Sequence, residues 1–174
     1  VALLGDGEAI DPIRVFVGVN TAPTPAARAR VAVDELERLG ALERSRILVC
    51  SPPLRGYVNP VPVKTHEVLS RGDVASVTVS AADALADTVL MPAKVPVAAL
   101  THRLVLQELR HRLDQRPGPH PQVEIYGESL GAWASQNVFL KDGLASLDAL
   151  GVGRALWAGT PAFRARNSSP PETM

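Results

Sequence analysis

The segment "VEIYGESLGAWAS", residues 123–135, decides the fold because an apolar strand pattern changes to a helical one across a single tight turn. "VEIY" is typical of a buried strand, and the residues that follow the turn have a helical pattern. Between them lies a Gly-x-Ser-x-Gly sequence, which runs from Gly127 through Ser129 to Gly131. Strand, sharp turn with a serine, and helix is the order that a nucleophile elbow requires. The motif fixes only three positions, so this context carries most of the prediction.

The residue types of the turn fit the chemistry of such an elbow. The turn forces Ser129 into a strained backbone conformation, so that its hydroxyl projects above the sheet as a catalytic nucleophile. Larger residues at Gly127 or Gly131 would collide with the neighbouring strand and helix. The backbone N–H of Leu130 would supply one oxyanion donor at a helix N-terminus. The alternative is a glycine-rich turn in which Ser129 only caps the helix.

The rest of the chain alternates between strands and helices. Apolar, β-branched runs predict strands over residues 13–19, 46–50, 74–80, 122–127 and 154–159. Between them, helical patterns are found after the Thr24-Pro25 start, over 65–72, and over 97–116, whereas Pro92 and Pro96 break residues 81–96. This alternation predicts an α/β fold, with a doubly wound, mostly parallel sheet covered by helices on both faces. We expect one domain over residues 1–174, with residues 164–174 as a disordered tail.

The expected apolar faces of the two longest helices follow from a 3.6-residue period. The first helix would bury Ala27, Val31, Leu36 and Leu39. The later helix would present five leucines on its apolar side, which are Leu100, Leu104, Leu106, Leu109 and Leu113.

Composition excludes several classes of function. Apolar residues make up 46% and charged residues 21%, and the formal net charge is zero. Because no basic block with interleaved aromatic residues occurs, nucleic acid is not an expected partner. The longest apolar runs, such as "VPVAAL", are far shorter than the ~18 residues of a membrane helix, so we expect this segment itself to be soluble.

The sequence also contains no pattern typical of a metal or cofactor site. "HEVLS" at His66 lacks the second histidine of a zinc helix, and "GVGRAL" at Gly151 lacks the third glycine of a dinucleotide loop. We therefore expect no cofactor and no bound metal. The single cysteine, Cys50, excludes an internal disulfide and is expected to be a buried strand residue.

The partners of a catalytic serine are the main difficulty. All four histidines precede Ser129, namely His66, His102, His111 and His120, whereas the triad histidine of such enzymes follows the serine. His120 would lie at the opposite end of the strand from Ser129, and His102 and His111 are expected to be solvated or helix-end groups. The downstream carboxylates are Asp142, Asp148 and Glu172, and none follows a strand. The pattern thus leaves two classes open, a serine hydrolase and a non-catalytic or binding α/β domain.

Several separated segments resemble one family. They are "IRVFVGVNTAPTPAARARVAVDELERLGALERSRILVC" (13–50), "GYVNP" (56–60), "RGDVASV" (71–77), "YGESLGAWASQNVF" (126–139) and "RALWAGTPAF" (154–163). Together they resemble the α/β-hydrolase catalytic domain of a family of actinobacterial membrane proteins. In that family several N-terminal membrane helices precede the catalytic domain.

The resemblance implies a serine hydrolase with Ser129 as nucleophile, and with the catalytic acid and histidine on later strands beyond Met174. It implies an incomplete sheet here, and membrane association only through a region absent from this chain. The substrate would be a small or lipid-like molecule with an ester or related acyl bond, cleaved through an acyl-enzyme. The second oxyanion donor is expected around Asn20-Thr21 or Ser51-Pro52. The fragment alone is expected to be almost inactive and prone to aggregation, whereas its oligomeric state is not predicted.

Overall fold

A computed structural model describes residues 8–53, 56–81, 91–140 and 143–161. The predicted tail, residues 164–174, lies outside these ranges. In chain order the elements are β1 (Ile13–Val17), α1 (Pro25–Arg38), the short 3₁₀ helix η2 (Ala41–Glu43), β2 (Arg46–Ser51), α2 (Pro60–Leu69), β3 (Val74–Val79), α3 (Met91–Asp114), β4 (Gln122–Glu128), α4 (Leu130–Asn137), α5 (Leu144–Ala149) and β5 (Val152–Ala158).

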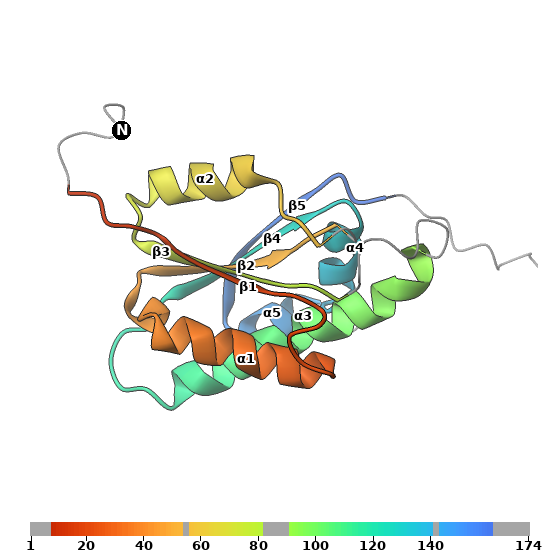
Figure 1. Cartoon of the computed structure of the whole chain (residues 1–174), viewed down its shortest axis with the longest axis horizontal. Helices are drawn as coiled ribbons and strands as arrows, with labels where there is room; N and C mark the ends of the chain where they lie inside the picture. The colour runs from red at the N-terminus through yellow and green to blue at the C-terminus, as the bar shows by residue number, and fades with distance from the viewer. Residues whose placement is uncertain (1–7, 54–55, 82–90, 141–142, 162–174) are drawn as a thin grey trace, which may run out of the picture.

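The five strands form one sheet in the order β1-β3-β2-β4-β5, and every neighbouring pair is parallel. The prediction of a parallel α/β sheet is therefore confirmed (Figure 1). The strand that precedes the serine, β4, lies between β2 and β5, so its carboxyl end is flanked by two other strand ends. The register pairs Ser51 of β2 with Gly127 of β4, and Glu128 with Ala158 of β5.

The two faces of the sheet are covered unequally. On one face α1, α3, α4 and α5 pack over a continuous apolar core, which includes the strand residues Val15, Ile47, Val77 and Ile125. On the other face α2 lies alone among the described helices (Figure 1). A small cluster around Leu48, Cys50, Val74 and Tyr126 forms the core on that side. Beyond α2, strand side chains on this face are exposed, including Phe16 at 59% and Leu156 at 60%.

The predicted apolar face of α1 is correct at Leu36 and wrong at Val31 and Leu39. Its buried side is formed by Ala29, Ala32, Val33 and Leu36, at the i, i+3, i+4, i+7 spacing of one helix face. Val31 and Leu39 instead point outward and are 38% and 39% exposed.

The helix α3 begins earlier than predicted and is not broken by proline. Pro92 lies in its first turn, where a backbone N–H would have no partner within the helix, and Pro96 lies only one turn further. Of the five leucines, Leu106, Leu109 and Leu113 are buried, whereas Leu100 is 49% exposed. Similarly, α2 begins at Pro60 rather than at residue 65, because the Asn59 side chain caps it by accepting from Val61 N–H.

Candidate active site

Ser129 lies at the junction of β4 and α4 in an unusual backbone conformation. Its φ is 55° and its ψ is −124°, a combination that residues with a side chain rarely adopt. Within the described ranges, Arg71 is the other non-glycine residue with positive φ. The Ser129 side chain makes no capping hydrogen bond to α4, so the interpretation of Ser129 as a simple helix cap is wrong. The turn therefore holds the Ser129 backbone in a strained conformation, while the Ser129 hydroxyl makes no capping hydrogen bond to α4.

The two glycines of the motif are required by close contacts. A Cβ at Gly127 would lie 2.9 Å from the Cα of Ala132 and 3.1 Å from Trp157 Cδ1. A Cβ at Gly131 would lie 2.1 Å from the carbonyl oxygen of Ser51 and 2.4 Å from that of Pro52. Real Cβ contacts essentially never fall under 3.0 Å. Gly131 therefore allows the start of α4 to touch the loop that follows β2.

The start of α4 presents backbone donors beside the serine. The first hydrogen bond of the helix runs from Trp133 N–H to Ser129 O at 3.2 Å, so the amide of Leu130 has no acceptor within the helix. The Ser129 N–H itself donates to Ala158 O of β5 at 2.9 Å. An N–H without an acceptor in its own helix, next to the serine and at the positive end of that helix, has the character of an oxyanion donor.

Of the two segments expected to hold a second donor, Ser51-Pro52 lies at the elbow, as its contact with Gly131 shows. Asn20-Thr21 follows β1, which is separated from β4 by β3 and β2, about 14 Å at normal strand spacing. Neither Pro52 nor Pro53 carries an N–H. The next amides, of Leu54 and Arg55, lie outside the described residues.

None of the four histidines forms a hydrogen bond with Ser129. His111 contacts Gln115, and His120 contacts Arg116 O, both near the end of α3 and remote from the elbow. His66 of α2 lies across the sheet and pairs with the buried Glu124 of β4. The carboxylate of Glu124 also accepts from Arg46 at 2.6 Å.

The fourth histidine, His102 of α3, contradicts the prediction of a solvated or helix-end group. It is 5% exposed, and burial lowers its pKa to about 4, so it is neutral at pH 7. Its Nε2 lies 3.1 Å from Ser135 Oγ, which also accepts from Trp157 Nε1 at 3.1 Å. These hydrogen bonds were not predicted from the sequence, because helical periodicity does not show which polar residues of different elements face each other.

The downstream carboxylates provide no triad acid among the described residues. Asp148 lies near the end of α5 and is exposed, whereas Asp142 and Glu172 fall outside the described ranges. The buried Cys50 is unsuited as an alternative nucleophile, because burial raises the pKa of its thiol to about 12. The described residues contain no cluster of three or more side chains placed to bind a metal ion.

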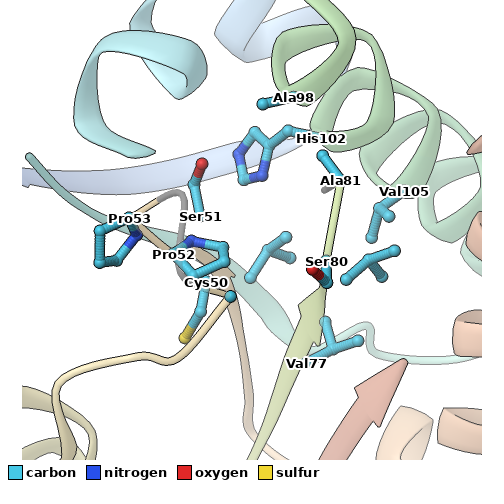
Figure 2. Close-up of a pocket in the computed structure, with 13 residues that line it drawn as sticks. Cys50, Ser51, Pro52, Pro53, Val77, Ser80, Ala81, Ala98, His102 and Val105 are labelled. Carbon is cyan, nitrogen blue, oxygen red and sulfur yellow. The ribbon is translucent and has the colours of Figure 1, made fainter. Parts of the chain in front are cut away.

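A cavity of about 20 Å³ lies beside the elbow, between the carboxyl ends of β2 and β3 and the helix α3. Figure 2 shows Ser51, Ser80 and His102 among its lining residues. This volume accommodates about one water molecule and is too small for an acyl group. The cavity, which is lined mainly by apolar side chains, is therefore too small to be a substrate pocket.

The match to a known family comes from a comparison with protein-family profiles. Residues 13–169 match an alpha/beta-hydrolase family, which covers most of the chain. The chain belongs to this alpha/beta-hydrolase family. No curated protein and no solved structure gives a significant match.

Membership of the alpha/beta-hydrolase family agrees with the parallel sheet and with a turn that joins β4 to α4. It suggests a hydrolase and leaves the bond, the substrate and the reacting residue open. Across the part of the chain that the structure describes, we find no helix with the length and apolar character needed to span a membrane.

Proposed function

We propose that this alpha/beta-hydrolase domain cleaves an ester or related acyl bond with Ser129 as nucleophile. The observation that carries the proposal is the backbone of Ser129, held at φ 55° and ψ −124° between β4 and α4 while its hydroxyl makes no capping bond. Such strain persists only where the surrounding structure enforces it, and here Gly127, Gly131 and the Ala158 carbonyl do so.

The reaction would proceed in two steps. Ser129 Oγ attacks the acyl carbon as a base takes its proton, and the tetrahedral oxyanion accepts a hydrogen bond from Leu130 N–H. The bond to the leaving alcohol then breaks, and the alcohol takes the proton from the protonated base. Water attacks the acyl-enzyme in the same way, which releases the acid and regenerates the serine.

The base and the acid are proposed to come from residues beyond Met174. The four histidines of this chain bond to other groups, and the family resemblance implies that both partners follow Ser129 in the polypeptide. On that resemblance alone, we also propose that the complete protein is membrane-associated through helices that precede Val1. The substrate would be a small or lipid-like acyl compound.

The test compares ester hydrolysis by the polypeptide extended to its natural C-terminus with that of the isolated 174 residues. We expect p-nitrophenyl ester hydrolysis by the extended protein, at least 10³-fold slower in Ser129→Ala. A matched serine change, Ser146→Ala on α5, should leave the rate unchanged, because the Ser146 hydroxyl donates to Gly143 O at the N-terminus of its own helix. The isolated 174 residues should show little turnover. Equal rates for Ser129→Ala and the parent protein would refute the proposal.

A further inference from the structure

The end of β5 contacts the elbow at three points. Ala158 O accepts from Ser129 N–H at 2.9 Å, which fixes the amide of the serine itself. The neighbouring Trp157 packs against Gly127, in the space that a Cβ there would enter. Trp157 Nε1–H also donates to Ser135 Oγ of α4 at 3.1 Å. One strand end thus holds the serine, the turn before it and the helix after it.

The hydroxyl of Ser135 extends this contact to α3. Ser135 is completely buried, and its Oγ lies 3.1 Å from Nε2 of the buried His102. Because an indole N–H can only donate, Ser135 Oγ accepts from Trp157 and has its own proton to donate. A neutral imidazole protonated at Nδ1 accepts that proton at Nε2, so both hydrogen bonds at Ser135 Oγ pair a donor with an acceptor. The hydrogen bonds from Trp157 to Ser135 and from Ser135 to His102 thus link β5 through α4 to α3.

We propose that Trp157 and His102 are positioning residues for the reaction, and that they act through Ser135 to fix the rotation of α4. The inference rests on the proposed function, because the rotation matters only if the Leu130 amide serves as an oxyanion donor. It assigns a role to three residues that lie outside the Gly-x-Ser-x-Gly motif.

The helix α4 needs such an external constraint. It has eight residues, and no side chain caps its N-terminus. Isolated helices of this length are unstable in water. At a Cα radius of about 2.3 Å, a rotation of roughly 25° moves a backbone atom by about 1 Å. Oxyanion donors must lie about 2.7–3.1 Å from the developing charge, so such a movement would remove the hydrogen bond. Bonds from β5 and α3 to a single hydroxyl of α4 oppose this rotation.

The experiment uses four variants of the protein extended to its natural C-terminus. His102→Leu removes the acceptor at similar volume, whereas His102→Gln restores an acceptor oxygen within reach of Ser135. Trp157→Phe removes the donor and keeps an aromatic ring. Val33→Ala, on the buried face of α1, is the control for a general loss of stability.

Two readouts are measured on each variant. The first is amide hydrogen exchange at Leu130–Trp133, and the second is the rate of Ser129 labelling by a fluorophosphonate, resolved into reagent affinity and maximal rate. We expect exchange at least 10-fold faster and a maximal rate at least 10-fold slower in His102→Leu and Trp157→Phe. Reagent affinity should stay unchanged, and His102→Gln should lie close to the parent protein. In Val33→Ala, any faster exchange should be spread over the protein rather than concentrated at Leu130–Trp133, and the maximal labelling rate should stay close to that of the parent protein.

Parent-like exchange and labelling in both His102→Leu and Trp157→Phe would overturn the inference. Equal impairment of His102→Gln and His102→Leu would also overturn it, because packing of the imidazole would then explain the effect without the hydrogen bond. Should His102→Leu fail to fold, the comparison of Trp157→Phe with Val33→Ala decides. If Ser129 is unlabelled in every protein, the proposed function fails. Hydrogen exchange then still decides whether Trp157, Ser135 and His102 position α4.

Discussion

Replacement of Gly131 by alanine tests the geometry of the elbow with a single methyl group. The added carbon would lie 2.1 Å from Ser51 O, 2.4 Å from Pro52 O and 2.6 Å from Pro52 C. Ordinary van der Waals contact begins at 3.4 Å, so either α4 or the loop after β2 must move by more than 1 Å. All three contacted atoms belong to the backbone, which cannot change rotamer to make room.

The expected cost of Gly131→Ala follows from these contacts. Overpacking of this kind costs about 1–3 kcal/mol and sometimes more, and three backbone contacts place it near the upper limit. Alanine is favoured over glycine in a helix by about 1 kcal/mol at most, which offsets only part of the loss. We expect a net loss of about 2 kcal/mol in the free energy of unfolding, or a melting temperature lower by about 4–8 °C.

Urea denaturation followed by circular dichroism measures this loss, and Gly18→Ala is the matched control. At Gly18 the nearest atoms to an added Cβ are side-chain atoms at 3.8 Å, so alanine fits without displacement. Alanine there should change stability by less than about 1 kcal/mol, and in the favourable direction. If Gly131→Ala were as stable as Gly18→Ala, the close approach of α4 to the β2 loop, and with it this account of the elbow, would be refuted.

Three further predictions concern the buried polar groups. Because burial lowers the pKa of His102 from 6.5 to about 4, the unfolded chain binds more protons between these values. The contribution of neutral His102 to the free energy of unfolding should be fully present above pH 6.5 and fall by up to about 3 kcal/mol as the pH approaches 4. Urea titrations of His102→Gln should show a free energy of unfolding that depends less on pH. Glu124→Gln should lose about 1–2 kcal/mol in chemical denaturation, because the one-third-exposed Arg46 loses the charge of its buried partner. Glu35→Gln, in the exposed pair with Arg38, should leave the midpoint unchanged. Cys50 is 3% exposed, and its thiol pKa is raised to about 12. It should therefore not react with a thiol reagent in the native protein and should react fully in urea. Rapid reaction of the native protein would contradict the burial of Cys50.

The parallel sheet and the site of the elbow were predictable because both depend on local patterns. Apolar β-branched runs such as residues 46–50 identify buried strands, and glycines two residues either side of Ser129 identify a turn that excludes side chains. The strand order was not predictable, because it depends on contacts between segments far apart in the sequence. For the same reason, the contact of the Ser51-Pro52 loop with Gly131 could not be predicted from the sequence.

Errors of prediction arose where tertiary packing overrode local preference. Pro96 suggested a helix break, yet α3 continues through it, and the neighbouring Val95 packs against Leu130 and Ala134 of α4. His102 was expected to be solvated, since a histidine on a helix with apolar and polar residues gives no sign of which face is buried. Its acceptor role depends on Ser135 and Trp157, which belong to two other elements.

Direct identification of the residue that a fluorophosphonate modifies tests the central claim most directly. The reagent forms a bond from phosphorus to the nucleophilic oxygen and releases fluoride, and peptide mass spectrometry of the extended protein locates the adduct. We predict a single adduct on Ser129, absent from Ser129→Ala and retained in Ser146→Ala. An adduct on a different serine, or a folded and hydrolytically active protein with Ser129 unmodified, would contradict the account.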